Sequence, residues 1–295
     1  SDLSKKSRKI AKDYNVKKVY QNYDIMLDDE ELDAIIVALP NHLHLDAVRK
    51  VAESGKHIYL EKPMARTVEE AEKILNITEK NNLKLMMGYP MPFDSNNIEI
   101  KKKILSHDLG DIEIFTTNFV SSGPFYHRAQ DNHPVPVPEW WFNKELTGGG
   151  VLLDLGCHVI NLSRWFFGEI IDIKSILGYR YNLDFEDKAT CYMKFKNGQI
   201  GVINLGWFSQ SYKFNIDFLG TIKNYTLSNN PPNKIITAMQ MLITGKSSFN
   251  EPFHKALSYF GDCIIEDIEP FPSGLDGLND MKTIFQAYEN QIIIN

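Results

Sequence analysis

The chain has 295 residues, of which 43% are hydrophobic and 24% charged, and its net charge is −6. This length allows two domains, and the acidic balance without a long basic stripe argues against nucleic acid as a partner. Three cysteines lie far apart, so neither a disulfide framework nor a zinc site is expected. No membrane span or signal peptide is visible, which predicts a cytoplasmic protein without a membrane partner.

Residues 1–110 alternate helix and strand. Helices are expected at 3–14, 43–53, 95–106 and from Thr67 onward, where Thr67 and Glu70 form a capping box. Strands are expected at 33–39, 56–60 and 83–88. The first of these is a continuous apolar run that ends at Pro40, as in a buried parallel strand. The alternation predicts an α/β fold with a Rossmann-like, doubly wound parallel sheet.

Residues 111–295 have a different texture, with long strands and few helices. Strands are expected at 112–120, 171–181, 188–195, 199–207, 213–219 and 223–227, and helices at 150–167 and 277–290. Asn197-Gly198 is a strong hairpin signal between two of the strands. We therefore expect a second, α+β domain with a large, mostly antiparallel sheet that binds substrate, and a last helix that packs back toward the first domain.

The beginning of the chain lacks the opening of a dinucleotide fold. Such a fold starts with a strand, a glycine-rich turn and a helix, whereas this chain starts at Ser1-Asp2, directly before a helix. Asp2 stands where the acidic residue that binds the adenosine ribose ends the second strand. We expect the natural protein to have about 20–30 residues upstream that form the missing unit. A carboxylate at Asp2 favours NAD over NADP, because it repels the 2′-phosphate.

Two short motifs suggest proton-transfer chemistry. Lys62 follows a predicted strand, and open α/β sheets bind ligands at the carboxyl ends of their strands. Asp154 and His158 follow the glycines at 148–150 and are four residues apart, on one helix face. An imidazole is well suited to move a proton near pH 7. The structural alternatives are a solvated lysine and an exposed ion pair.

Four stretches together resemble the Gfo/Idh/MocA family, which includes glucose–fructose oxidoreductase and inositol dehydrogenase. They are 33–44, 55–63 with Glu61-Lys62-Pro63, 148–158 with its glycine run, and 271–277. The resemblance implies that Lys62 is catalytic and stabilises charge on the reacting oxygen. It also implies that His158 accepts the proton of a substrate alcohol, while Asp154 orients the substrate and tunes both groups.

The same resemblance implies two sets of binding residues. The cofactor set is Asp2, Leu39, Pro40, Asn41, His44, Glu61 and Lys62. The substrate set is Tyr89, His127, Arg128, Trp141, Asp154 and His158. For the loop residues of the second set, surface packing is the structural alternative to a wall around a polyol.

Two features qualify the resemblance. His42 and His44 have the spacing of a metal pair, but the family has a histidine there without metal, so we expect no metal. In the stretch 88–93, Pro92 stands where the family often has an arginine. A basic substrate contact used by some members is therefore absent, although Arg128 could replace it, and the identity of the substrate stays open.

The resulting hypothesis is an NAD(P)-dependent oxidoreductase acting on a secondary alcohol of a sugar, sugar derivative or cyclic polyol. A dinucleotide-binding sensor or co-repressor without turnover and an NAD-assisted glycoside hydrolase are the alternatives. The predicted helices cover only one face of the large sheet, and strand 199–207 has apolar residues on both sides. We therefore expect a homodimer or homotetramer joined through the open sheet of the second domain.

Overall fold

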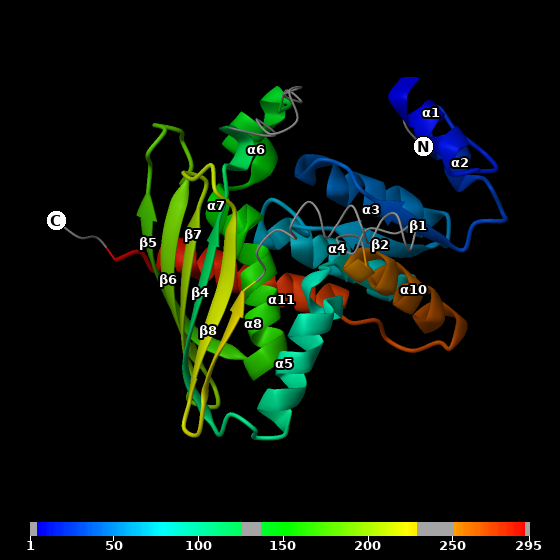
Figure 1. Cartoon of the computed structure of the whole chain (residues 1–295). Helices are drawn as coiled ribbons and strands as arrows, with labels where there is room; N and C mark the ends of the chain where they lie inside the picture. Colours follow the sequence, from blue (N-terminus) through cyan, green and yellow to red (C-terminus); the bar gives the residue numbers. More distant parts are fainter. Residues whose placement is uncertain (1–4, 126–136, 229–250, 293–295) are drawn as a thin grey trace.

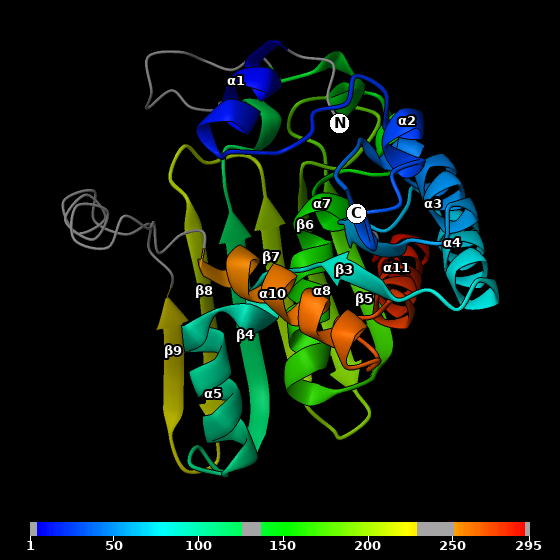
Figure 2. The same ribbon diagram turned by 90° about the vertical axis from the view of Figure 1, so that its right-hand side faces the viewer.

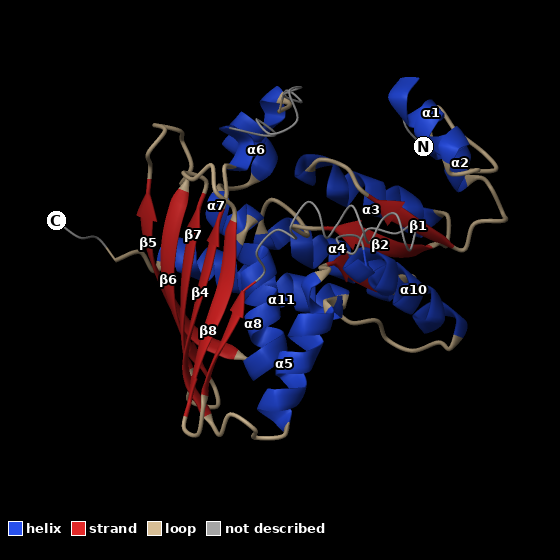
Figure 3. Ribbon diagram, viewed as in Figure 1, coloured by secondary structure: helices blue, strands red, loops and turns tan. Residues whose placement is uncertain are grey.

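The computed structural model describes residues 5–125, 137–228 and 251–292. Two sheets lie on either side of a layer of helices (Figure 1; Figure 3 colours the same view by secondary structure). Sheet A is parallel, in the order β1-β2-β3, and consists of β1 (Ala34–Val37), β2 (His57–Glu61) and β3 (Leu85–Gly88). This confirms the predicted α/β arrangement of the first part of the chain.

The helices of the first part of the chain are α1 (Lys5–Asp13), α2 (Tyr23–Leu27), α3 (His44–Glu53), α4 (Val68–Lys80) and α5 (Ser95–Leu105). Helix α3 packs on one face of sheet A, whereas α5 lies over sheet B (Figure 2). Half of the predicted capping box of α4 is present, because the Thr67 hydroxyl accepts the Glu70 amide N–H at 3.2 Å. The Glu70 carboxylate accepts the Arg66 N–H at 3.2 Å instead of that of Thr67. The other face of sheet A packs against α10 (Glu251–Ile265), where Phe260 contacts Tyr59 of β2 (Figure 2). Short 3-10 turns are η1 (Asn41–Leu43), η2 (Met91–Phe93), η3 (Gly123–Phe125) and η4 (Glu139–Phe142).

Sheet B has the strand order β5-β6-β7-β4-β8-β9. Its strands are β4 (Ile112–Val120), β5 (Ile170–Gly178), β6 (Lys188–Phe195), β7 (Ile200–Gly206), β8 (Lys213–Gly220) and β9 (Asn224–Ser228). All neighbours pair antiparallel except β4 and β7, which are parallel. The predicted large, mostly antiparallel sheet is therefore confirmed, and β4 joins it between two later strands.

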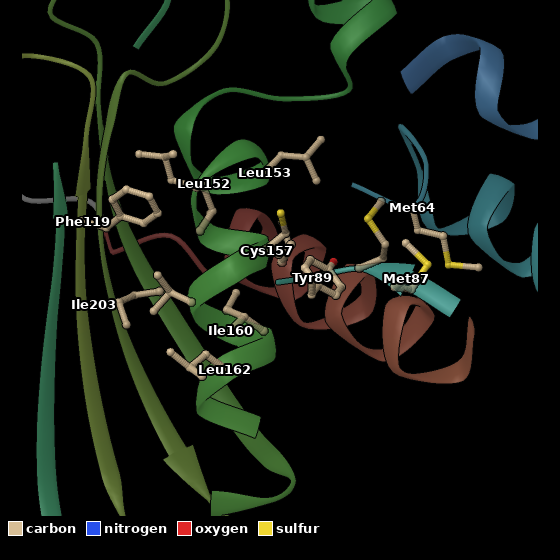
Figure 4. Packing of buried hydrophobic residues seen from close by; sticks show 14 of the residues in the cluster. Met64, Met87, Tyr89, Phe119, Leu152, Leu153, Cys157, Ile160, Leu162 and Ile203 are labelled. Atoms are coloured by element: carbon tan, nitrogen blue, oxygen red, sulfur yellow. The ribbon is translucent and has the colours of Figure 1, made fainter. Parts of the chain in front are cut away.

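A helical layer fills the space between the sheets. It contains α6 (Lys144–Thr147), α7 (Val151–Asp154), α8 (Gly156–Phe167) and α11 (Gly274–Glu289). Figure 4 shows Ile160 of α8 beside Phe119 and Ile203 of sheet B, and Tyr89 and Met87 on the side of sheet A. These side chains are all at most 8% exposed, so one continuous core fixes α7 and α8 against both sheets.

Three expectations about the helices need correction. The predicted helix at 150–167 is divided at Leu155 into α7 and α8. The last helix begins at Gly274 rather than Gly277, because the Ser273 hydroxyl and the Asp276 carboxylate form a capping box at its start. Helix α10 was not predicted, because its apolar side chains pack against sheet A, whose strands are far away in the sequence.

The two sides of β7 differ in burial, which the sequence alone did not decide. Ile203 and Leu205 are buried under the helices, whereas Val202 and Asn204 point to the opposite face and are partly exposed. None of the described helices covers that face (Figure 1). The open face of sheet B is therefore on the side of Val202 and Asn204, whereas Ile203 and Leu205 belong to the core.

Candidate active site

Lys62 and Asp154 meet between the two sheets, although they are 92 residues apart in the sequence. Lys62 follows the last residue of β2, and Asp154 is the last residue of α7. The Lys62 Nζ atom lies 2.7 Å from Asp154 Oδ1 and 3.3 Å from the Asp154 carbonyl oxygen. The two side chains are 20% and 22% exposed, so the ion pair is reachable from solvent. The structure thus brings together the two motifs that the sequence singled out.

The pair sets the charge state of the lysine. Burial lowers the pKa of the Lys62 ammonium, but the Asp154 carboxylate and the neighbouring Cys157 raise it, and the net effect is a pKa above its usual range. The Cys157 thiol donates to the Asp154 carbonyl oxygen at 3.2 Å, and burial raises the pKa of that thiol to about 12. At neutral pH the site therefore holds a charged lysine and a neutral thiol.

His158 lies one helical turn after Asp154, near the start of α8. Burial, and then the positive charge of Lys62, lower the pKa of this imidazole well below 6.5. Its ring packs edge-on against Tyr89, with ring centroids 5.9 Å apart. The imidazole is therefore neutral at pH 7, which is the state that a proton acceptor needs.

A cavity of about 310 Å³ opens beside the ion pair. It is lined by Ala38, Leu39, Asn41, Glu61, Lys62, Pro63, Trp140, Trp141, Thr147, Gly149, Leu153, Asp154 and Trp207. The lining residues come from the carboxyl ends of β1 and β2, from α6 and α7, and from the residue after β7. Such a position at the strand ends of a parallel sheet is typical of ligand sites in α/β proteins.

The cofactor residues expected from the sequence divide into four groups. Leu39, Asn41, Glu61 and Lys62 line the cavity. Pro40 precedes η1, beside them in the chain. His44 is fully buried, and its Nδ1 and Nε2 atoms lie 3.2 Å from the Met64 carbonyl oxygen and 2.8 Å from that of Leu39. Its ring therefore links the loop after β1 to the loop that follows Lys62. Asp2 lies outside the described residues.

Local packing explains the positions of two cavity residues. A Cβ atom on Gly88 would lie 3.2 Å from Glu61, so glycine at the end of β3 leaves room for the Glu61 side chain. Burial raises the pKa of this carboxyl group, while Lys62 lowers it. The Asn41 Nδ2 atom donates to the Thr147 carbonyl oxygen at 2.9 Å, which ties the loop after β1 to α6. Both contacts hold polar groups at the cavity wall.

The expected substrate residues have mixed positions. Trp141 lines the cavity, and Tyr89 is 1% exposed behind His158. His127 and Arg128 lie outside the described residues. Trp207 was missed as a lining residue, because its position directly after a strand gives no indication of which sheet edge it reaches.

Two negative findings concern the described parts of the chain only. Within residues 5–125, 137–228 and 251–292, no group of three or more His, Cys, Asp or Glu side chains is arranged to hold a metal ion. In the same ranges, no helix combines the length and the apolar character that crossing a bilayer requires.

A parallel sheet with a lysine at the end of a strand, and an aspartate and a neutral histidine on the helices that face it, is typical of dinucleotide-dependent oxidoreductases. Comparison with known families agrees. Residues 1–89 match the model described as oxidoreductase family, NAD-binding Rossmann fold, and residues 98–225 match the GFO/IDH/MocA C-terminal domain. The chain belongs to the Gfo/Idh/MocA oxidoreductase family, and its first part is the NAD-binding domain of that family.

Individual relatives are distant. Levoglucosan dehydrogenase of Pseudarthrobacter phenanthrenivorans is 27% identical over 202 residues, which are 60% of this chain and only half (50%) of the relative. The scyllo-inositol 2-dehydrogenase (NAD(+)) of Bacillus subtilis is 22% identical, over 95% of this chain and 81% of the relative. A crystal structure of a probable dehydrogenase from Thermotoga maritima superimposes with a TM-score of 0.82 at 19% identity, over 98% of this chain and 88% of that chain.

Proposed function

We propose that the chain is a dehydrogenase that uses NAD, with NADP as the alternative, to oxidise a secondary alcohol of a sugar, sugar derivative or cyclic polyol. The observation that supports this most is the 2.7 Å contact between Lys62 Nζ and Asp154 Oδ1 beside a cavity, with a neutral His158 one turn away. His158 does not itself line the cavity, but the charge of Lys62 acts on its imidazole. A charged donor with a neutral base nearby is what the removal of an alcohol proton requires.

Each of the three side chains has a distinct task. The Lys62 ammonium has three N–H donors, and two of them point to the Asp154 Oδ1 and carbonyl oxygens. The third donates to the substrate hydroxyl and stabilises negative charge that develops on its oxygen. His158 accepts the hydroxyl proton. Asp154 keeps the lysine charged and in place.

The same cavity would hold the nicotinamide end of the dinucleotide. Leu39, Asn41 and Glu61 line it, and a partly buried carboxylate such as Glu61 is a suitable acceptor for ribose hydroxyls. When bound, nicotinamide supplies the acceptor for the hydride that leaves the alcohol carbon. The residues of this chain orient the alcohol toward it.

The wall opposite the lysine suggests the class of substrate. Trp140 and Trp141 have ring centroids 5.5 Å apart, and Trp141 and Trp207 lie 6.4 Å apart. Flat aromatic faces suit the apolar side of a sugar or cyclitol ring, while the charged groups handle its hydroxyls. Two of the relatives above are named for levoglucosan and scyllo-inositol, which supports this class.

A panel of sugars and cyclic polyols, assayed by NADH absorbance with NAD and with NADP, tests the proposal. We expect turnover with at least one uncharged member, and a rate about 10²–10⁴-fold lower in Lys62→Ala. Binding of NAD without reduction across the panel would instead favour a sensor. Release of sugar from a glycoside without net NADH would favour the NAD-assisted hydrolase.

We also propose that two copies associate through the open face of sheet B. Ile114, Tyr192, Ile200 and Leu219 are 39%, 44%, 48% and 44% exposed on neighbouring strands of that face. A contiguous apolar patch of this kind usually marks an interface. Sedimentation at micromolar concentration should give a dimer or tetramer, and Tyr192→Asp should dissociate it. Ile265→Asp, at an 83% exposed position on α10, is the matched control. A monomeric parent would contradict the proposal.

A further inference from the structure

The three glycines before α7 each lie against a different part of the molecule. A Cβ atom on Gly148 would be 2.5 Å from the Arg66 carbonyl oxygen, and Gly148 has a φ of +88°. A Cβ atom on Gly149 would be 2.4 Å from the Tyr288 hydroxyl, and one on Gly150 would be 1.9 Å from the Glu186 carbonyl oxygen. The glycine run therefore allows three distant segments to approach the start of α7 closely.

The first turn of α7 is capped by one of these segments. Gly150 is the N-cap residue of α7, and it has no side chain that could accept the free N–H groups of the first turn of the helix. Glu186, which lies between β5 and β6, accepts two of these N–H groups instead. Its carbonyl oxygen accepts the Val151 N–H at 3.0 Å, and its Oε1 atom accepts the Leu152 N–H at 2.9 Å.

The capping carboxylate is itself held from a third element. The Tyr288 hydroxyl, on α11, donates to the same Oε1 atom of Glu186 at 2.8 Å. Glu186 is 2% exposed, and burial raises its pKa, although the Leu152 N–H and the Tyr288 hydroxyl lower it. Sheet B, α7 and α11 are therefore fastened together at a single buried carboxyl group.

This fastening point is one helical turn from the candidate catalytic pair. Asp154 donates its backbone N–H to the Gly150 carbonyl oxygen at 3.0 Å, so its place depends directly on the first turn of α7. Its carboxylate must then reach Lys62 Nζ on the other side of the cavity. A shift of the first turn moves the carboxylate relative to the lysine, since the helix transmits it without a flexible link.

We propose that Glu186, held by Tyr288, is a positioning residue that sets the Asp154–Lys62 contact. The inference rests on the function proposed above. Glu186 touches neither substrate nor cofactor in this scheme, and it acts through α7. A purely structural role would predict lower stability with an unchanged site, whereas positioning predicts lower kcat and an altered environment of Lys62.

Three variants and one control separate these roles. Glu186→Leu removes both side-chain contacts, Glu186→Gln keeps an acceptor for the Leu152 N–H, and Tyr288→Phe removes only the hydroxyl. Ser175→Ala is the control, because Ser175 Oγ donates to the Ala287 carbonyl oxygen at 2.6 Å and so joins sheet B to α11 without touching α7. Glu186→Leu, Tyr288→Phe and Ser175→Ala each remove at least one buried hydrogen bond near α11, whereas Glu186→Gln keeps an acceptor oxygen.

The first readout is kinetic. A small displacement of reacting groups costs on the order of 10²-fold in rate, so Glu186→Leu should lower kcat by about that factor while KM changes little. Glu186→Gln and Tyr288→Phe should lose less, and Ser175→Ala should keep the parent kcat. In an Asp154→Asn background, the Glu186 changes should cost much less than in the parent, because they act through Asp154.

The second readout does not need turnover. Asp154 raises the pKa of Lys62, so NMR titration of the Lys62 ammonium should show a lower pKa in the Glu186 variants and no change in Ser175→Ala. If Glu186→Leu and Tyr288→Phe kept the parent kcat and the parent Lys62 titration, the inference would be wrong. If the parent showed no turnover but the Lys62 pKa fell as expected, the proposed function alone would fail.

Discussion

The two consecutive helices α7 and α8 contain two ion pairs, one near the start of the segment and one near its end. At one end, Asp154 meets Lys62 with an N–O distance of 2.7 Å. At the other end, Arg164 Nη1 meets Asp280 Oδ1 of α11 at 2.6 Å. The first pair joins α7 to the end of β2, the second joins α8 to α11, and both combine a cation with an aspartate at nearly the same distance. By type and geometry of contact, the two are equivalent.

Their surroundings differ. Lys62 and Asp154 line a cavity, and one donor of the lysine has no partner among the described residues. Asp280 is 0% exposed, and its second oxygen accepts the Asn161 Nδ2–H at 2.8 Å. In the Arg164–Asp280 pair, called the closed pair below, both carboxylate oxygens are engaged and neither residue lines the cavity, whereas the Lys62–Asp154 pair, called the open pair, lines the cavity and keeps one donor available. Access, rather than the ion pair itself, distinguishes a candidate catalytic contact from a structural one.

The largest expected effect tests the open pair. Lys62→Ala, Asp154→Asn and His158→Ala should each lower kcat by about 10²–10⁴-fold, because each removes a group that holds or moves the reacting proton. Dinucleotide affinity, measured by NADH fluorescence, should change far less. Parent-like turnover in all three variants would place the chemistry elsewhere.

The closed pair should respond in stability instead of rate. At pH 8, Arg164→Met leaves the Asp280 carboxylate buried without its cation, and we expect a loss of about 3–5 kcal/mol in the free energy of unfolding. Urea denaturation measures the loss, and kcat per folded molecule should stay near that of the parent. A large fall in kcat without loss of stability would remove the distinction between the two pairs.

The pH dependence of stability sharpens the same comparison. Burial raises the pKa of Asp280 from 3.8 to about 7, although Arg164 and Asn161 lower it. A raised carboxyl pKa means that the folded state binds the proton more tightly than the unfolded state. The contribution of this group is therefore full below about pH 4 and is lost as the pH rises through 7. Asp280→Asn should abolish this part of the pH profile in urea titrations.

The histidine beside the open pair should titrate unusually low. Burial, and then the charge of Lys62, lower the pKa of His158 below 6.5, so the acidic limb of kcat/KM should lie below pH 6.5. Lys62→Met removes the positive charge and should raise the pKa of His158, as NMR of the ring would show. Exposed His107 serves as the internal reference in the same spectra. An identical His158 pKa in the parent and in Lys62→Met would contradict this.

The smallest expected effect concerns the aromatic wall of the open site. Trp140→Ala should raise KM for a sugar or polyol by about 3–10-fold, because loss of the indole face removes roughly 30–50 Å² of apolar contact with the substrate ring, or about 0.7–1.3 kcal/mol. Its kcat should change little, since the ring touches no reacting group in the proposed scheme. Phe142→Ala is the control, because Phe142 belongs to the same η4 segment but does not line the cavity. Equal KM values in both variants would remove Trp140 from the site.

Much of this fold could be predicted from local patterns. The apolar runs of β1 and β2, the hairpin at Asn197-Gly198 and the cap at Thr67 depend on neighbours in the sequence, and all are present. Helix α10 was missed, because its Phe260 is buried by Tyr59 of a sheet formed about two hundred residues earlier. Periodicity indicates that a face will be buried, but not which surface covers it.

The sequence alone determined which residues are candidates for the site. Lys62 after a strand, and Asp154 and His158 on one helix face, follow from spacing, and the resemblance to a family suggested their roles. The tertiary structure decided three further features. They are the 2.7 Å contact between Lys62 and Asp154, which are 92 residues apart, the low pKa of His158, and the buried ion pair of Arg164 with Asp280. The tertiary structure also gave the glycine run its meaning, since a missing Cβ matters only once Arg66, Tyr288 and Glu186 are packed against it. Contacts between distant segments depend on how whole elements pack, and local sequence carries no record of that.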